Sequence, residues 1–273
     1  MAQRVWTALV AMTLILGGLL WPAKWPFTLV ACTALFFGGE ELARLLNWGW
    51  KSRVSAALYS TAFAAACWVA SAYGPLVMVG MQAIVFAVGC LSLFLRNTEK
   101  PHPLAWLGMG WLSAPIFCLI SVHLWGSPGP NPAALIFLSL WVGDTLALLT
   151  GKAIGKNLLA PTLSPSKTWE GAIGGIVGSI LAAMGFGIAY EVPWPAAFAI
   201  GATCGILGLT GDLFESFLKR RMGVKDSGGL FPGHGGMLDR IDSMLMASIP
   251  SSAILMVSTP ALFIFQDWTG LLR

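Results

Sequence analysis

Residues 172–190 read AIGGIVGSILAAMGFGIAY, a stretch of nineteen residues without one charged side chain. A helix that crosses a lipid bilayer needs about 20 mostly apolar residues, so this stretch predicts a membrane-spanning helix. The stretches on either side, 132–150 (PAALIFLSLWVGDTLALLT) and 196–211 (AAFAIGATCGILGLTG), predict two more. This half of the chain is therefore expected to consist of apolar helices joined by polar loops.

Nine stretches of this kind occur along the 273 residues. We expect an all-α, polytopic integral membrane protein, because an open sheet edge would leave backbone hydrogen-bonding groups unpaired in lipid. The nine predicted spans are Val5–Trp21, Phe27–Leu46, Val54–Ala72, Leu76–Leu95, Leu104–Trp125, Pro132–Thr150, Ala172–Tyr190, Ala196–Gly211 and Ile241–Phe265.

The scarcity of charge excludes several classes of protein. Charged residues make up 10% of the chain, whereas soluble domains carry about 25%. This excludes an ordinary soluble enzyme, a disordered chain, a coiled coil and a basic protein that binds nucleic acid. The five cysteines are scattered singly, so they predict neither a disulfide framework nor a metal site.

The positive charges predict the orientation in the membrane. With nine helices, 14 of the 16 Lys and Arg residues fall on the side that also holds the N-terminus. Cytoplasmic loops carry the excess of Lys and Arg. We therefore place the N-terminus and the long loops in the cytoplasm, and the C-terminus outside.

The polar segments divide the chain into two regions. We expect residues 1–130 to form a scaffold of transmembrane helices that could contribute to dimerisation. Residues 131–273 are expected to form the catalytic region, with cytoplasmic loops at 151–170 and 212–240. Glycine pairs spaced by four residues (Gly171/Gly175, Gly174/Gly178, Gly201/Gly205) allow close helix packing, either within one chain or between two copies.

Acidic side chains at membrane depth are costly and usually mark function. The first 130 residues contain only Glu40, Glu41 and Glu99. Seven of the 12 acids lie near the predicted cytoplasmic ends of helices: Asp144, Glu170, Asp212, Glu215, Asp226, Asp239 and Asp242. The chemistry is therefore expected in the second half of the chain.

The richest polar stretch is GDLFESFLKRRMGVKDSGGLFPGHGGMLDRID, residues 211–242. Its glycines allow backbone N–H groups to converge on an anion. Carboxylates, cations and bare amides are the parts needed to bind a polyphosphate and stabilise its transfer, and the oxygen ligands suit Mg²⁺. The residues that share a predicted helix face are Asp212, Glu215 and Lys219 in one helix, and Asp239 and Asp242 in the next.

Simpler interpretations of this stretch exist. Lys219, Arg220 and Arg221 could serve only membrane topology and contact with anionic lipid. That interpretation does not account for the acids and glycines between the bases. His234, which lies among glycines and a proline, has no core to occupy and is expected near phosphate.

A second polar loop, 150–171, ends in SPSKTWEG just before a predicted helix. Thr168 or Ser166 could cap this helix, with Glu170 in its first turn. Lys167 opposes the dipole of the helix unless an anion is present. We therefore expect Lys167 to bind phosphate or nucleotide, which is compatible with capping.

These motifs resemble those of one enzyme family. SFLKR (216–220), KD (225–226) and PGHGGMLDRID (232–242) closely resemble the C-terminal motif of the phosphatidate cytidylyltransferases, also called CDP-diacylglycerol synthases. Three further segments are similar to the same family: GDLFE (211–215), Asp144-Thr145 with Gly151-Lys152, and SPSKTWEG (164–171). The resemblance is specific over roughly residues 140–245.

The resemblance implies an activity, partners and a location. The implied reaction transfers a cytidylyl group from CTP to phosphatidate and gives CDP-diacylglycerol and pyrophosphate. The implied enzyme is a homodimer that spans the cell inner (cytoplasmic) membrane several times, with its active site facing the cytoplasm. It needs Mg²⁺, and a monovalent cation such as K⁺ is expected beside the Mg²⁺.

The resemblance also suggests roles for single residues. The expected catalytic residues are Asp212, Lys225, Asp226, His234, Asp239 and Arg240. The expected substrate-binding residues are Asp144, Lys152, Ser164, Lys167, Thr168, Glu215, Lys219 and Arg220. The expected metal ligands are first Asp212 and Asp239, then Asp242 and Asp144.

Two other functions remain alternatives. A CTP-dependent lipid kinase would phosphorylate a lipid hydroxyl and release CDP, whereas the transferase releases pyrophosphate. A close variant of the transferase reaction is cytidylyl transfer to an ether-linked lipid. A transporter would show inverted repeats and acids at the bilayer midplane, whereas this sequence shows no evident repeat and its acids cluster at one face.

Overall fold

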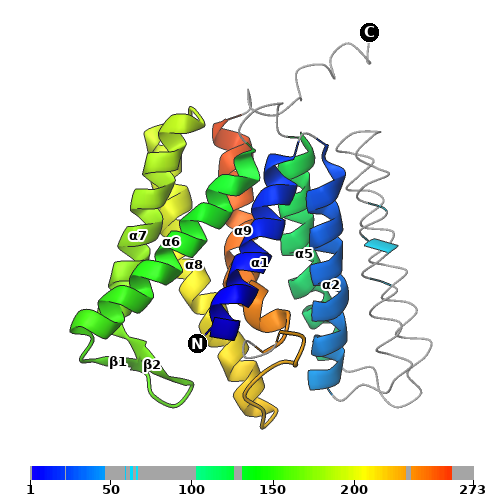
Figure 1. Cartoon of the computed structure of the whole chain (residues 1–273), viewed down its shortest axis with the longest axis vertical. Coiled ribbons are helices and arrows are strands. Elements are labelled where there is room, and N and C mark those ends of the chain that lie inside the picture. The colour runs from blue at the N-terminus through cyan, green and yellow to red at the C-terminus, as the bar shows by residue number, and fades with distance from the viewer. Residues whose placement is uncertain are drawn as a thin grey trace. The chain divides into compact units, whose positions relative to one another are not determined.

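The computed structural model describes residues 2–21, 23–46, 59, 62, 63, 66, 103–125, 131–231 and 235–259. Helices dominate this part of the chain (Figure 1). They are α1 (Ala2–Leu20), α2 (Trp25–Leu45), α5 (Pro103–Trp125), α6 (Pro132–Ile154), α7 (Trp169–Ala189), α8 (Trp194–Arg221) and α9 (Leu238–Ser258).

The all-α membrane fold is confirmed. Each of the seven helices coincides with one of the nine predicted spans, and four of them, α6 to α9, are long and apolar enough to cross a membrane. The predicted spans Val54–Ala72 and Leu76–Leu95 lie outside the described residues, apart from four isolated positions. The total of nine helices therefore stays a prediction.

Three features differ from the predicted loops. Helix α6 continues to Ile154, four residues into the predicted loop 151–170, so Lys152 lies on a helix. Residues 158–168 contain a short antiparallel hairpin of β1 (Leu158–Ala160) and β2 (Ser164–Thr168). Helix α8 continues ten residues beyond its predicted end at 211. Its last turns hold a Glu215–Lys219 pair at i,i+4 spacing, which stabilises a helix after the apolar residues have ended.

The described chain forms two compact units. The first comprises Met1–Leu124 and Arg221–Ile241, and the second comprises Trp125–Arg220 and Asp242–Arg273. The glycine-rich loop that follows α8 thus belongs to the same unit as the N-terminal helices. The proposed division of roles between residues 1–130 and 131–273 stays a prediction.

In the second unit, α6, α7 and α8 pack closely because glycine lies at their contacts. A Cβ atom added to Gly175 would lie 2.9 Å from the Cβ of Ala147 on α6. A Cβ atom on Gly205 of α8 would lie 2.7 Å from the Cα of Ile176 on α7. The glycine pairs therefore serve packing within the chain, one of the two predicted alternatives. Figure 1 shows the hairpin where α6 ends and α7 begins.

One face of α7 is exposed and apolar. Ile173, Val177, Leu181 and Ile188 are exposed, and their spacing of four or seven residues places them along one stripe of the helix. An exposed stripe of this kind is unfavourable in water. It suits a surface that contacts lipid.

In the first unit, α2 packs against α5 and carries an acidic side chain into the core. A Cβ atom on Gly108 of α5 would lie 3.1 Å from Leu42. Next to Leu42, the side chain of Glu41 is buried. At the other end of α2, burial lowers the pKa of Lys24, whose ammonium donates a hydrogen bond to the carbonyl oxygen of His123 (2.9 Å).

Candidate active site

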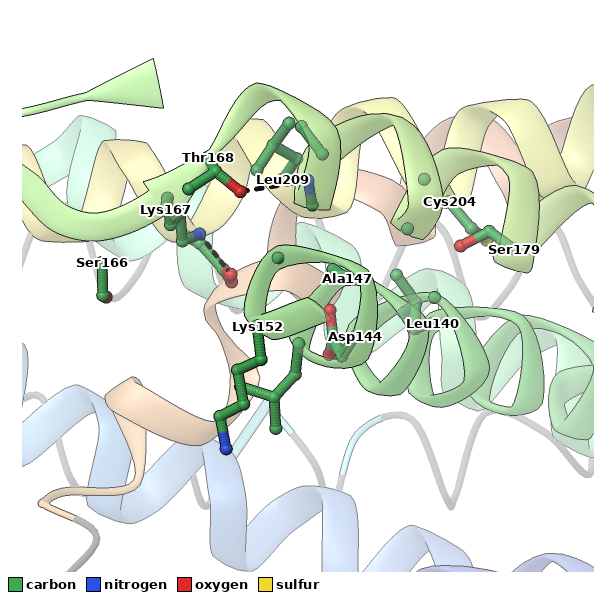
Figure 2. A pocket seen from close by; sticks show the side chains of 18 residues that line it. Leu140, Asp144, Ala147, Lys152, Ser166, Lys167, Thr168, Ser179, Cys204 and Leu209 are labelled. Atoms are coloured by element: carbon green, nitrogen blue, oxygen red, sulfur yellow. Dashed lines mark hydrogen bonds and ion pairs between the residues drawn. The ribbon is translucent and has the colours of Figure 1, made fainter. Parts of the chain in front are cut away.

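A cavity of about 380 Å³ lies in the second unit, between α6, α7, α8 and strand β2. Most of its wall is glycine or apolar side chains. The polar groups come from four elements, as Figure 2 shows for most of them. The polar side chains that line the cavity are Asp144 and Lys152 on α6, Ser166, Lys167 and Thr168 on β2, Ser179 on α7, and Asp212 on α8.

The geometry of α6 explains one side of this cavity. Asp144, Leu148 and Lys152 are spaced by four residues, so they share one face of the helix, and all three line the cavity. The helix begins at a regular cap, in which the side chain of Asn131 accepts a hydrogen bond from the backbone N–H of Ala133 (3.1 Å). Because they share this face of α6, the acid Asp144 and the base Lys152 lie on the same wall of the cavity.

Lys167 forms the central ion pair of the cavity. Its Nζ lies 2.6 Å from Oδ2 of Asp212, with side chains that are 25% and 28% exposed (Figure 2). The sequence predicted that Lys167 binds phosphate or nucleotide, which stays a prediction; in this structure its partner is a carboxylate of the chain itself. The pair joins β2 to α8, 45 residues apart.

The predicted helix cap is also confirmed. The hydroxyl oxygen of Thr168 accepts a hydrogen bond from the backbone N–H of Gly171 (3.1 Å) at the start of α7. Glu170, in the first turn, accepts a hydrogen bond from the side-chain amide of Asn157 (2.7 Å). These contacts tie the hairpin to α7 and fix Lys167 beside the cavity.

A second group of charges lies next to Asp212 on α8. The buried carboxylate of Glu215 is 1% exposed and accepts a hydrogen bond from Nζ of Lys219 (2.9 Å). The carboxyl groups of Glu215 and Asp212 both lie close enough to the side chain of Asp242 on α9 to interact with it. Neighbouring carboxylates repel one another unless a proton or a cation lies between them.

Asp239 lies in the first unit and has a different environment. Its Oδ2 accepts hydrogen bonds from the backbone N–H groups of Ser227 (3.0 Å) and Gly236 (2.7 Å), and from the hydroxyl of Ser227 (2.9 Å). Gly235 adopts a φ of +81°, a conformation that glycine tolerates and other residues rarely adopt. The glycine-rich loop therefore folds back onto Asp239.

The remaining predicted residues are placed as follows. Ser164 begins β2 and does not line the cavity. His234 lies outside the described residues. The exposed side chains are Arg220 at the end of α8, Lys225 and Asp226 in the loop, and Arg240 in the first turn of α9.

The structure brings together part of the predicted site in each unit. Asp212, Glu215 and Asp242 come together in the second unit, whereas Asp239 belongs to the first. Within the described part of the chain, no three His, Cys, Asp or Glu side chains are arranged to hold a metal ion. The assignment of metal ligands therefore stays a prediction.

Glu41 is not among the site residues that the sequence predicts. In the structure its carboxylate accepts hydrogen bonds from the backbone N–H groups of Met237 and Leu238, both at 2.9 Å, and from the hydroxyl of Ser227 (3.0 Å). The available signal was an acid inside an apolar helix, which usually marks function.

Comparison with known proteins identifies the family. The family model described as "Cytidylyltransferase family" matches residues 2–258. A protein named phosphatidate cytidylyltransferase from Brucella abortus biovar 1 is 31% identical over 266 residues, which cover 90% of this chain and 89% of the relative. A protein of the same name from Staphylococcus aureus is 39% identical over 155 residues, 52% of this chain and 59% of the relative. With nearly all of its length matched, this chain belongs to the cytidylyltransferase family.

Proposed function

We propose that this protein transfers the cytidylyl group of CTP to phosphatidate and produces CDP-diacylglycerol and pyrophosphate. Relatives that bear the name phosphatidate cytidylyltransferase support this substrate pair. The observation that carries the proposal is the cavity of the second unit. Lysine and aspartate side chains line this cavity, and glycines form much of the rest of its wall. The helices that enclose it are apolar enough to span a membrane.

The reaction is a displacement at phosphorus. An oxygen of the phosphatidate phosphate attacks the α-phosphorus of CTP in line. A new P–O bond forms, and the bond from the α-phosphorus to the bridging oxygen of the β-phosphate breaks, which releases pyrophosphate. A phosphate monoester is already ionised near pH 7, so the step needs no strong general base. The protein must mainly reduce repulsion between two anions.

Lys152 and Lys167 are suited to that task because both line the cavity. In the proposed complex Lys167 exchanges Asp212 for a phosphate oxygen, since an ammonium group on a flexible stem moves readily between two anions. Thr168 keeps its hydroxyl proton for a further hydrogen bond, because in the cap it acts as an acceptor. Lys219, Lys225 and Arg240 are proposed to hold other phosphate oxygens.

Mg²⁺ is the proposed cofactor. The donor atoms near Asp212 are carboxylate oxygens, which Mg²⁺ prefers. The neighbouring carboxyl groups of Glu215 and Asp242 need positive charge or a proton nearby. We propose Asp212 and Asp242 as ligands, with Asp144 and Asp239 as further candidates, and K⁺ as a second cation. When bound, Mg²⁺ supplies positive charge that offsets the charge of the phosphates.

The same proposal includes location and assembly. The exposed apolar stripe of α7 supports contact with the lipid bilayer. The concentration of Lys and Arg on one side supports a cytoplasmic active site in the cell inner membrane. This location brings a lipid phosphate and a cytosolic nucleotide to one surface. A homodimer is proposed from the family resemblance.

A product assay tests the function. The full chain, purified in detergent, is incubated with CTP, Mg²⁺ and phosphatidate, and the lipid and nucleotide products are separated. We expect CDP-diacylglycerol and pyrophosphate, and no product when diacylglycerol replaces phosphatidate. Release of CDP with a phosphorylated lipid alcohol would overturn the proposal in favour of a lipid kinase.

A further inference from the structure

The buried carboxylate of Glu41 organises the glycine-rich loop from a distant helix. Glu41 lies on α2 and is 4% exposed. Its Oε1 accepts a hydrogen bond from the N–H of Met237, and its Oε2 accepts one from the N–H of Leu238, both at 2.9 Å. These donors are 196 and 197 residues away along the chain.

The two backbone donors mark the start of a helix. Leu238 is the first residue of α9, and the first N–H groups of a helix have no partner inside the helix. A negative charge at this end is also favoured by the helix dipole. Glu41 therefore caps α9 from another element and fixes where the loop ends and the helix begins.

Ser227 connects Glu41 to Asp239. Its hydroxyl lies 3.0 Å from Oε2 of Glu41 and 2.9 Å from Oδ2 of Asp239. A serine hydroxyl has one proton, so the two carboxylates share a single donor. The position of Asp239 is thereby coupled to that of Glu41.

Two glycines of the loop leave room for this carboxylate. A Cβ atom on Gly228 would collide with Oε1 of Glu41, and a Cβ atom on Gly236 would collide with the Glu41 carboxylate and with the hydroxyl of Ser227. The sequence predicted that backbone N–H groups of this motif converge on an anion. In this structure the anions that Gly236, Met237 and Leu238 contact are carboxylates of the chain itself.

The neighbouring acid shows that this environment is specific to one position. Glu40 forms a salt bridge with Arg44 one turn later on α2 (2.8 Å), and both side chains are partly exposed. Glu41 forms no salt bridge within the residues that the structure describes. Its charge is stabilised by amide donors, a hydroxyl and a helix N-terminus.

We propose that Glu41 is a positioning residue for the cytidylyl transfer: through the backbone of Met237 and Leu238 and through Ser227, it holds the loop that carries Lys225 and the start of α9, which carries Asp239 and Arg240. The proposal rests on the proposed function, since the positioned groups are those expected to bind phosphate and metal. It gives the first 130 residues a part in the chemistry beyond that of a scaffold.

The test compares two isosteric variants of adjacent residues, Glu41→Gln and Glu40→Gln. In E41Q the side-chain amide would turn one NH₂ group toward backbone N–H donors, and a charge-assisted acceptor would be lost. We expect kcat of E41Q to fall about 10- to 100-fold, as for other residues that orient groups in a site, with a raised KM for CTP. E40Q should stay within about twofold of the wild type, the change expected on losing an exposed ion pair.

The KM value separates positioning from mere stabilisation. A variant that only unfolds more readily has fewer active molecules, so its apparent kcat falls while KM for CTP stays unchanged. If E41Q keeps the wild-type KM, the proposal is overturned. If E41Q does not fold, Ser227→Ala takes its place: it removes the shared hydroxyl, and wild-type kcat and KM in S227A overturn the proposal.

Amide hydrogen exchange supplies a readout that does not depend on activity. In E41Q we expect faster exchange in peptides that cover 222–241, and unchanged exchange in α6 and α7. If the wild type makes no CDP-diacylglycerol but E41Q shows this local loss of protection, the proposed function fails while the control of the loop by Glu41 stands. If exchange in the loop equals that of E40Q, the positioning role is wrong.

Discussion

The cavity of the second unit and the glycine-rich loop of the first both hold carboxylates, but they hold them with different partners. In the cavity, Asp212 is paired with Lys167, and beside it Glu215 is paired with Lys219. Around the loop, Glu41 of α2 and Asp239 of α9 accept hydrogen bonds from backbone N–H groups and from Ser227. One set of carboxylates faces mobile cations, and the other faces the main chain.

The difference in partners implies a difference in behaviour. A lysine ammonium group is a compact charge on a flexible stem, so a lysine can leave its carboxylate when a substrate anion or a metal arrives. A backbone N–H group moves only if the loop itself changes conformation. We expect the cavity to exchange its ion pairs during turnover, while the loop keeps its hydrogen bonds.

The largest effect is expected at Asp212. Asp212→Asn removes a proposed metal ligand and the partner of Lys167, so kcat should fall by at least about 10²–10³-fold, the cost of removing one stabiliser of charge in the transition state. Pyrophosphate release at saturating CTP and Mg²⁺ measures it. Glu191→Gln, outside the cavity, is the matched control, and near-normal turnover of D212N would remove Asp212 from the site.

Replacement of Lys167 tests whether the Lys167–Asp212 ion pair of the cavity opens to bind a substrate phosphate. Lys167→Met should raise KM for CTP or for phosphatidate about 10- to 100-fold, because a hydrogen bond to a charged group contributes about 1.5–3 kcal/mol. Lys156→Met changes an exposed lysine that does not line the cavity. Equal KM values for the two variants would show that Lys167 only neutralises Asp212.

Gly236 tests whether the loop is fixed. In Gly236→Ala the new methyl group would collide with the carboxylate of Glu41, and crowding of this kind costs about 1–3 kcal/mol. We expect about tenfold lower kcat and faster amide exchange in the loop. Gly229→Ala is the control in the same loop, since nothing lies within 4 Å of its added Cβ atom. Equal behaviour of the two variants would mean that the loop adapts.

The smallest effect is expected at the cap of α7. Thr168→Ala removes the acceptor for the N–H of Gly171 and should lower the free energy of unfolding by about 1 kcal/mol. Thermal unfolding in detergent, with Thr162→Ala from the hairpin turn as the control, measures it. No difference between the two variants would indicate that the hairpin positions Lys167 without this cap.

The sequence predicts well whatever depends on composition or on local spacing. The apolar stretches predicted the described helices, because burial of a whole helix in lipid needs only length and hydrophobicity. Thr168 was recognised as a cap because capping depends on residues three positions apart. The close packing at Gly175 and Gly205 followed in the same way from small residues at a spacing of four.

Features that depend on distant parts of the chain could not be predicted. The hairpin at 158–168 contains serine, proline and lysine and lacks the alternating pattern of a strand. The sequence predicted Asp212 as a metal ligand, whereas its contact with Lys167 requires that β2 and α8 come together in the fold. Glu41 caps α9 from 197 residues away, and no local pattern connects the two.

The glycine contacts between α6, α7 and α8 have a consequence for how this protein can vary. Any missense change at Gly143, Gly175 or Gly205 adds atoms where a neighbouring helix already lies. A mutation at these positions can therefore only increase the distance between the helices. The width of the cavity is set by this spacing. Changes of substrate preference should therefore arise more readily at side chains such as Lys152 and Ser166 than at these glycines.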